Sequence, residues 1–320
     1  MKVGVFNPVL YHMNFADAVK YLASQNVSMI ELGCGGYPGT KHADAKVLAG
    51  GGKALDEIKA VLKDNGVAVS ALSVHGNPVS PDPAFTKSCR DDFIAACKLA
   101  NKLGTDRVVT FSGCPGDGKG DKPNWVTCSW PSEFSEMLKY QWEDVLIPYW
   151  QEAALIARDN GVKHICLEMH PGFCVYNPGT LMRLRAAVGE AICVNFDPSH
   201  LIWQGIDPAE AIRYLGAAIQ HFHAKDTEIY PHNRAVQGVL DTGSMGKAAE
   251  RSWLFRTVGY GLPEIDWKRM VSALKIVGYD YVLSVEHEDL LMSSQEGLEK
   301  AIGFLQRIVI EQSAAAAWWV

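Results

Sequence analysis

The sequence predicts a single-domain α/β protein with the (β/α)8 TIM-barrel fold. Three observations favour this fold. Short apolar runs alternate with amphipathic segments along the whole chain. Several amphipathic segments end in glycine just before the next apolar run, as at Gly66, Gly161 and Gly278, and glycine commonly terminates helices. The chain has 320 residues, enough for eight β/α units, which together occupy about 250 residues.

The eight predicted strands are short apolar runs, and each is followed by polar residues. In chain order they are Lys2–Phe6, Ser28–Leu32, Ala68–Val74, Arg107–Phe111, His164–Glu168, Ile192–Phe196, Ile219–His223 and Tyr281–Glu286. The predicted helices have apolar residues at helical spacing. They are Phe15–Ser24, Ala54–Asn65, Cys89–Leu103, Trp142–Asn160, Pro178–Val188, Pro208–Leu215, Trp267–Val277 and Gly297–Val309. A doubly wound open sheet is the alternative, but the first strand lacks the GxGxxG turn of that fold.

Two connections are longer than a barrel requires, at about residues 112–134 and 224–263. Both follow strands, so both leave the face on which barrel enzymes carry their sites, and we expect lids or substrate walls. An oligomer contact is the alternative for either. The barrel is expected to span residues 1–312, followed by a tryptophan-containing C-terminal tail at 313–320 to which we assign no chemistry.

Composition narrows the class of protein. The net charge of −6 gives no basic surface for a nucleic-acid backbone, and no apolar run is long enough to cross a membrane. The eight cysteines form no CxxC pair, as is typical of reduced thiols in the cytoplasm. We therefore expect a cytoplasmic protein that binds a small polar molecule, and neither a nucleic acid nor a membrane.

Four polar residues end or follow four successive predicted strands: Glu168, Asp197, His223 and Glu286. Burying a lone carboxylate is costly, so an apolar strand that delivers one to a barrel mouth usually has a use for it. Each residue alone has an ordinary explanation, such as a core ion pair or a helix N-cap. Together they predict a site for one divalent metal ion, because carboxylate oxygens and imidazole nitrogens are suitable ligands.

Further polar residues accompany this set. His170 comes two residues after Glu168, and His200 comes three residues after Asp197. Lys225 suits an anionic or developing oxyanion group of a substrate, although an ordinary salt bridge is an equal alternative. His75 ends the third strand and is a candidate substrate contact, with a structural hydrogen bond as its alternative.

The ordered Glu–Asp–His–Glu set resembles that of the xylose isomerase-like TIM barrels, in particular the sugar phosphate isomerase/epimerase branch with its ketose 3-epimerases and inosose-processing enzymes. The resemblance covers nearly the whole chain. It implies that the four residues bind one Mn²⁺, with Co²⁺, Mg²⁺ or Zn²⁺ as alternatives. It also selects His223 over His221 as the ligand and implies that His200 contacts the substrate. Relatives are often oligomers, so a homodimer or homotetramer is expected.

The resemblance implies a metal-dependent isomerase or epimerase. Such an enzyme removes a proton next to the carbonyl of a keto-sugar, or of a modified or oxidised sugar, through a metal-bound enediolate, with Glu168 and Glu286 as the catalytic pair. A lyase or dehydratase acting on an inosose or 3-oxo-glycoside is the first alternative, and a non-catalytic sugar-binding protein is the second. A three-metal nuclease of the same superfamily is disfavoured, because no D-x-H pair follows His223.

Two positions depart from the ketose 3-epimerase pattern. Cys174 stands where those enzymes carry a substrate-binding glutamate, and Ile229 stands where they carry an arginine. Arg256 is the candidate replacement for that arginine. These departures and the two long connections favour a larger or modified substrate. The predicted substrate contacts are His75, His170, His200, Lys225 and Arg256.

Overall fold

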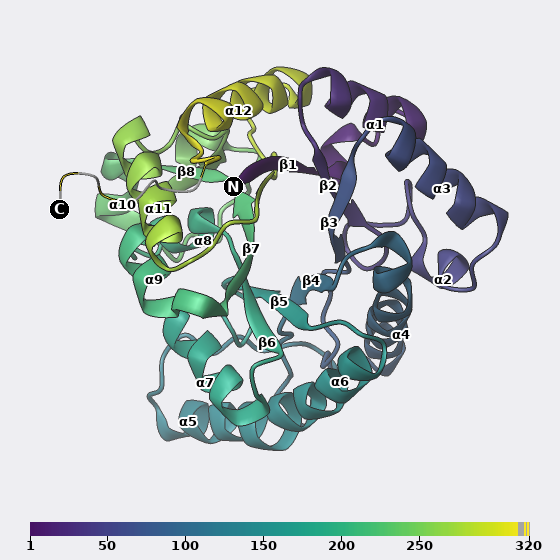
Figure 1. Ribbon diagram of the computed structural model, residues 1–320. Coiled ribbons are helices and arrows are strands. Elements are labelled where there is room, and N and C mark those ends of the chain that lie inside the picture. Colours follow the sequence, from purple (N-terminus) through teal and green to yellow (C-terminus); the bar gives the residue numbers. More distant parts are fainter. Residues whose placement is uncertain (313–316, 318, 320) are drawn as a thin grey trace.

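The computed structural model describes residues 1–312, 317 and 319, and in it eight parallel strands close into a barrel wrapped by helices (Figure 1). The order of strands around the barrel is β1-β10-β7-β6-β5-β4-β3-β2. Their bounds are β1 Lys2–Phe6, β2 Met29–Gly33, β3 Ala68–Ser73, β4 Arg107–Phe111, β5 His164–Glu168, β6 Ile192–Phe196, β7 Ile219–Ala224 and β10 Val282–Val285. Each predicted strand overlaps one barrel strand, so the predicted TIM-barrel fold is confirmed.

The helices pack around the outside of the barrel (Figure 1). They are α1 Phe15–Ser24, α2 Ala45–Leu48, α3 Lys53–Asp64, α4 Pro83–Ala100, α5 Ser132–Lys139, α6 Ile147–Asp159, α7 Pro178–Val188, α8 Pro198–Ile202, α9 Pro208–Leu215, α10 Pro231–Gln237, α11 Glu264–Ile276 and α12 Ser294–Ile308. Four short 3₁₀ segments are η1 Asn7–Leu10, η2 Asn101–Leu103, η4 Gly216–Ala218 and η5 Ala248–Glu250, and η3 Tyr140–Leu146 is a π-helix.

Two helices begin five or six residues from their predicted start, and three others shift by one to three residues. The helix predicted to start at Cys89 starts at Pro83, because the Asp82 side chain accepts hydrogen bonds from the amides of Ala84 and Phe85 and proline is compatible with the first turn. The helix predicted from Trp142 is continuous with α5 through the π-helix η3. Local apolar spacing did not reveal the wider turn.

The connection after β7 contains more structure than the sequence predicted. Strands β8 Asp226–Ile229 and β9 Trp253–Arg256 form an antiparallel pair, and α10 lies between them. Each strand has only four residues and its partner lies far along the chain, so neither gives a strong local pattern. The buried carboxylate of Asp226 closes the base of this insertion, accepting hydrogen bonds from the amides of Gly259, Gly261 and Leu262 and from the indole of Trp267.

Side chains alternate between the inside of the barrel and the outer helices. On β5, Leu167 joins the large core between strands and helices, whereas Cys166 points inward and packs with Ala71, Val109 and Cys193. This small apolar layer lies beneath the polar ends of the strands. Among the described residues, no helix combines the length and hydropathy needed to cross a membrane. The predicted C-terminal tail falls mainly on residues 313–316, 318 and 320, which lie outside the described residues.

Candidate metal centre

Four predicted ligand side chains converge where four neighbouring barrel strands end. Their ligand atoms all lie within 4.8 Å of one another, and the residues are Glu168, Asp197, His223 and Glu286. Glu168 ends β5 and His223 lies in β7, while Asp197 and Glu286 directly follow β6 and β10. Alternation along parallel strands turns these positions into the barrel. The structure therefore brings together all four residues that the sequence predicted as ligands.

Asp197 has one oxygen engaged by the backbone and one facing the cluster. Its Oδ1 accepts a hydrogen bond from the amide of Ser199 at 2.8 Å, as the N-cap of α8. Its Oδ2 is buried without a hydrogen bond of good geometry, although Lys225 Nζ lies 3.1 Å away and His200 Nε2 lies 3.3 Å away. A buried carboxylate oxygen left this way is suited to a cation.

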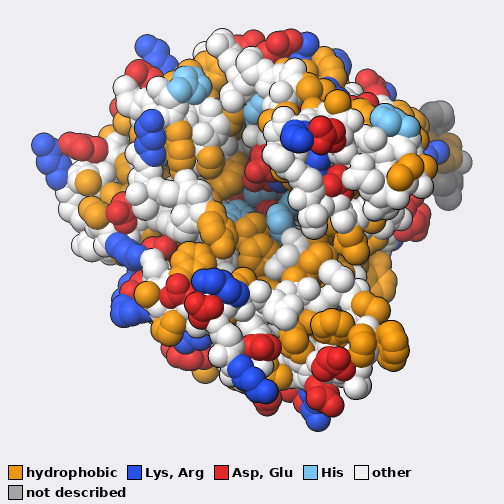
Figure 2. Space-filling model, turned by 180° about the vertical axis from the view of Figure 1, so that it is seen from behind, with side chains coloured by type: hydrophobic (Ala, Val, Ile, Leu, Met, Phe, Trp, Pro, Cys, Tyr) orange, Lys and Arg blue, Asp and Glu red, His pale blue; other side chains and the backbone are white. Residues whose placement is uncertain are grey.

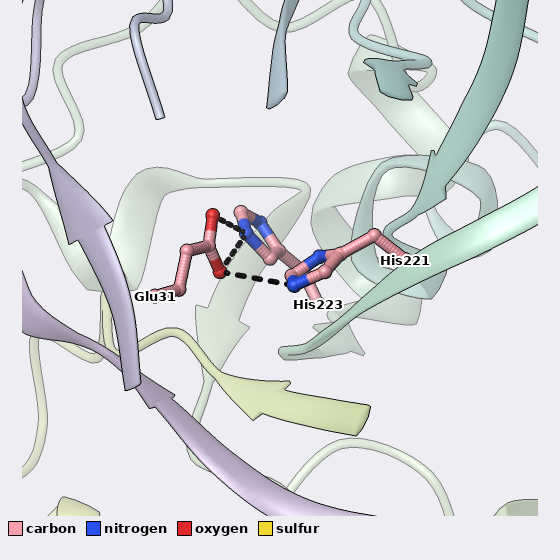
Figure 3. Close-up of side chains that lie close together, drawn as sticks. All are labelled: Glu31, His221 and His223. Atoms are coloured by element: carbon pink, nitrogen blue, oxygen red, sulfur yellow. Dashed lines mark hydrogen bonds and ion pairs between the residues drawn. The ribbon is translucent and has the colours of Figure 1, made fainter. Parts of the chain in front are cut away.

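His223 is held in the same manner, with one ring nitrogen engaged and one facing the cluster. Nε2 lies 2.9 Å from both oxygens of Glu31 (Figure 3). Nδ1 lies 3.0 Å from Glu168 Oε2 and 3.2 Å from Glu286 Oε2, and it is buried without a hydrogen bond. When the Nε2 proton is donated to Glu31, Nδ1 keeps its lone pair on the side of the carboxylates.

Glu31, which sequence reasoning missed, is the carboxylate that orients His223. It is fully buried on β2 and also accepts hydrogen bonds from the hydroxyls of Ser73 and Ser284. Burial alone raises the pKa of Glu31, but the imidazoles of His223 and His221 outweigh this and lower it to about 2. The signal was present in the sequence, because Glu31 is an acid inside the apolar strand MIELG, which is the pattern that drew attention to Glu168.

Glu31, His221 and His223 also form a set with ligand atoms within 4.8 Å of one another (Figure 3). Their polar atoms already have protein partners. His221 Nδ1 lies 2.9 Å from Asn195 Oδ1, and Glu31 accepts the hydrogen bonds described above. This set is therefore better explained as the support of His223 than as a second metal site. In this explanation His221 supports His223 and is not itself a metal ligand.

Glu168 is the most heavily contacted member of the cluster. Asn195 Nδ2 donates to its Oε2 at 3.0 Å, and His75 Nε2 and His200 Nε2 each lie 3.2 Å from one of its oxygens. Burial alone raises the pKa of Glu168, but the neighbouring imidazoles of His200, His223 and His75 outweigh it and hold the pKa well below its usual range. Glu168 is thus an ionised carboxylate in a fixed orientation.

Lys225 supplies a cation at the edge of the cluster. Its buried Nζ lies 2.7 Å from Glu286 Oε2, 3.0 Å from Glu288 Oε2 and 3.1 Å from Asp197 Oδ2. Burial alone lowers the pKa of Lys225, but these carboxylates outweigh it and hold the pKa well above its usual range. Even with Lys225 present, burial and the charges of Glu168 and Glu286 raise the pKa of Asp197 to about 7.

These features fit a divalent cation. Two buried ligand atoms, Asp197 Oδ2 and His223 Nδ1, lack hydrogen bonds, and three carboxylates crowd one small volume. A bound cation would relieve the repulsion that raises the pKa of Asp197. Three carboxylates and one imidazole form a donor set compatible with manganese, cobalt, magnesium or zinc.

The predicted substrate residues divide into two groups. His75 and His200 contact Glu168, and the ring of His170 lies 4.1 Å from that of His200, centroid to centroid. Burial, with a smaller effect of His200, lowers the pKa of His170 to about 3, so its ring is neutral. Arg256 is different. It pairs with Glu228 and, at 3.2 Å, with Asp289, and these contacts do not include the cluster.

The cluster adjoins a cavity of about 310 Å³, lined by residues that include Phe6, Tyr37, His75, Phe111 and Glu286. We call it the first cavity. Figure 2 shows a hollow near the middle of one face of the molecule, with histidine and acidic side chains at its floor and hydrophobic side chains around it. Glu286 is the member of the cluster that lines this cavity, and the volume suits a small molecule.

Comparison with known proteins gives matches along almost the whole chain. A family model described as xylose isomerase-like TIM barrel matches residues 19–308. The uncharacterized protein YfiH of Bacillus subtilis (strain 168) is 38% identical over 312 residues, covering 97% of this chain and 99% of YfiH.

Several solved structures share the fold. IolI with a bound zinc atom has a TM-score of 0.67 at 18% identity, covering 98% of this chain and 100% of that one. The probable 3-DHS dehydratase AsbF from Bacillus anthracis has a TM-score of 0.66 at 16% identity, covering 96% and 99%. The 3-keto-D-glucoside 4-epimerase YcjR from E. coli has a TM-score of 0.63 at 14% identity, covering 96% and 99%. D-psicose 3-epimerases also match.

At these identities the solved structures establish a shared fold, and the family assignment rests on the family model and on YfiH. The closed eight-stranded barrel and the nearly complete coverage agree with it. This chain belongs to the xylose isomerase-like TIM barrel family.

Proposed function

We propose that this protein is a divalent-metal-dependent isomerase or epimerase that removes a proton next to the carbonyl of a keto-sugar, or of a modified or oxidised sugar. One observation carries the proposal. Asp197 Oδ2 and His223 Nδ1 are buried without hydrogen bonds, inside a cluster whose other members are the carboxylates of Glu168 and Glu286. Four converging ligands of this kind are costly for a protein that only binds sugar.

A bound divalent cation would supply Lewis acidity, which stabilises negative charge on a carbonyl oxygen while the neighbouring C–H bond breaks. Manganese is the expected ion, with cobalt, magnesium and zinc as alternatives. Three carboxylate donors favour the harder ions manganese and magnesium, whereas the imidazole donor also suits cobalt and zinc.

The proton transfers are assigned to Glu168 and Glu286. Glu168 ends β5, and Glu286 directly follows β10. Strands β6 and β7 lie between them in the barrel wall, so the two carboxylates approach the cluster from different sides. One carboxylate takes the proton from carbon and the other returns one from the opposite face. Glu286 keeps 15% of its side chain exposed, which gives it a route for proton exchange with water, whereas Glu168 is held by four neighbours.

Two neighbours assist this chemistry. His200 Nε2 lies 3.2 Å from Glu168 Oε1 and orients that carboxylate. Lys225 Nζ lies 2.7 Å from Glu286. Its positive charge would stabilise negative charge that develops on a substrate oxygen. We retain His75 and His170 as substrate contacts, because His75 lines the first cavity and His170 packs on His200.

A lyase or dehydratase acting on an inosose or 3-oxo-glycoside is the second candidate. It begins with the same proton abstraction and then expels a hydroxyl or alkoxyl group on the next carbon. Cys174 and Ile229 favour it, since they replace polar groups that a free ketose would need. The product distinguishes the two reactions, because isomerisation conserves mass whereas elimination divides the substrate or removes water.

The first test is the metal content of protein purified without a metal-affinity tag, measured by elemental mass spectrometry. We expect about one manganese, cobalt, magnesium or zinc ion per chain. The loaded protein should then catalyse the exchange of solvent deuterium into D-fructose or methyl 3-oxo-β-D-glucopyranoside. A protein that takes up none of these ions, even on incubation with them, would overturn the proposal and favour a sugar-binding role.

A further inference from the structure

A second, larger cavity adjoins the metal centre. It has a volume of about 550 Å³ and includes His170 and His200 among its lining residues. Its walls come from both long connections, with Trp125 from the connection after β4 and with Leu240 and Phe255 from the insertion after β7. We call it the aromatic cavity. The two unusually long connections predicted from the sequence thus both line the aromatic cavity.

Packed rings give the aromatic cavity its shape. Trp203 stacks on Trp253 with ring centroids 4.7 Å apart and an angle of 3° between the planes. Phe255 contacts His200 edge to face at 5.2 Å, and Trp125 contacts Tyr176 in the same manner at 5.5 Å. Interlocked rings lose little conformational freedom when a ligand binds, so this is a preorganised apolar surface.

Two polar atoms of the lining residues lack partners. The indole N–H groups of Trp125 and Trp203 are buried and have no hydrogen-bond partner among the described residues, and Trp203 itself is only 6% exposed. Buried indole N–H groups normally find an acceptor. Because both N–H groups are shielded here, the ring faces form the surface that a ligand would meet.

Buried side-chain contacts hold the wall of the aromatic cavity in one conformation. Arg251 is buried, its guanidinium lies 2.9 Å from Asp241 Oδ1, and it sits 4.9 Å over the ring of Trp253. Arg251 also donates to the backbone carbonyls of Asp241 and Gly243, so it holds the segment that carries Leu240. This buried charge network stabilises the wall of the aromatic cavity, which is not part of the barrel core.

The metal centre is therefore flanked by two cavities. The first cavity, of about 310 Å³, includes Glu286 and His75, and the aromatic cavity, of about 550 Å³, includes His170 and His200. A single sugar ring held at the cluster would leave the larger and more apolar cavity without a ligand group. Two compartments of different chemistry on either side of the reacting centre indicate a substrate with two parts.

We propose that the aromatic cavity binds the aglycone of a glycoside whose sugar reacts at the metal centre. The aglycone is an apolar ring system joined to the sugar through a glycosidic oxygen. This inference rests on the proposed function. It adds that the substrate is an aryl glycoside of an oxidised sugar rather than a free monosaccharide.

The test compares two probes that differ only in the aglycone, phenyl and methyl 3-oxo-β-D-glucopyranoside. Their affinities for the metal-loaded protein are measured by isothermal titration calorimetry. We expect the phenyl glycoside to bind at least about tenfold more tightly, because it transfers a ring from water to an apolar surface. In the Leu240→Asp variant this preference should fall to about twofold or less, since Leu240 is 58% exposed and its replacement puts a charge in the wall without disturbing the core.

Two further variants separate the contributions. Trp203→Phe replaces the indole that stacks on Trp253 by a smaller ring, so it should reduce the preference for the phenyl glycoside. Trp130→Ala removes a tryptophan that is 78% exposed and does not line the aromatic cavity, and it should leave the preference unchanged.

Equal affinities for the phenyl and methyl probes, with solvent-deuterium exchange intact, would overturn the aglycone proposal and leave the proposed function standing. If neither probe bound and no exchange occurred, both would fail. A change of oligomeric state in Leu240→Asp with an unchanged probe preference would assign the aromatic cavity to a contact between copies of the chain, which also overturns the proposal.

Discussion

The floor and the walls of the site are built in different ways. The floor consists of buried charged side chains at the ends of hydrogen-bonded barrel strands, including Glu31, Glu168 and His223. The walls come from the two long connections and are held in place by a few buried ties, among them Asp226 and Gln141. Under the proposed function, the floor would determine which reaction is chemically accessible, and the walls would determine what else the substrate can carry.

The contrast also appears in the partners of each group. Floor residues contact one another, so Glu168 alone meets His75, His200 and His223. Each long connection in the walls is instead held in part by one side chain that forms hydrogen bonds with several backbone groups. A change in the floor should therefore alter chemistry and metal binding, whereas a change in a wall tie should alter local stability and substrate choice. The following predictions test this division.

The largest effect is expected for Glu168→Gln. Loss of one ligand charge and of one member of the catalytic pair should lower the deuterium-exchange rate by roughly 10²–10⁴-fold and weaken metal binding. Exchange kinetics and metal titration measure the two effects. Glu288→Gln is the matched control, because its side chain is 51% exposed and it lies outside the ligand set, so its rate should fall far less. Full activity in Glu168→Gln would contradict the proposed mechanism.

Asp226→Asn should be the most damaging wall substitution. Asp226 accepts hydrogen bonds from four backbone and indole N–H groups outside its own strand, and an amide would turn a donor toward some of them. We expect a loss of about 1–3 kcal/mol or more in the free energy of unfolding, measured by urea denaturation. The control Asp266→Asn, at a surface ion pair with Arg269, should change it by less than about 1 kcal/mol. Equal stability of the two variants would show that Asp226 does not tie the insertion.

Glu31→Gln tests the support of the floor. If Glu31 holds the ring of His223 so that Nδ1 faces the cluster, its replacement should weaken metal affinity by roughly 10–100-fold while the chain stays folded. Calorimetric titration with Mn²⁺ measures the affinity, and circular dichroism monitors the fold. An affinity equal to that of the unaltered protein would remove Glu31 from the metal centre.

Gln141→Met should give the smallest effect. Gln141 Nε2 donates to the carbonyls of Pro115, Gly116 and Asn124 and so holds the connection after β4. Without these bonds, trypsin should cleave after Lys119 several-fold faster, while the global free energy of unfolding changes by only about 1 kcal/mol. Gln151→Met, which loses one surface hydrogen bond to Ala187, is the control. Unchanged cleavage would show that this wall is held by other contacts.

Much of the floor could be predicted from the chain alone. An acid or histidine at the end of an apolar strand is visible in the sequence, and a closed parallel barrel brings such ends together. Glu31 carried the same signal within MIELG and was missed because it does not belong to the four-residue set. The place of Arg256 in the chain predicts a substrate contact, and the structure shows its ion pairs with Glu228 and Asp289, so that contact stays a prediction.

The walls could not be predicted in the same way. The sequence showed only that the connections at 112–134 and 224–263 are long. The pairing of β8 with β9, the stacking of Trp203 on Trp253 and the meeting of Trp125 with Phe255 around one cavity join residues far apart in the chain. No local periodicity encodes such contacts.

The sequence by itself determined the barrel and its family, along with the four residues that converge at its mouth, because hydrophobic periodicity and strand alternation are local properties that repeat along the chain. Only the tertiary structure decided that Glu31 supports His223, that Lys225 bridges Glu286 and Glu288, and that an aromatic cavity adjoins the cluster. These depend on which side chains meet across the barrel and above it. Their geometry is fixed by close packing of the whole chain rather than by any single segment.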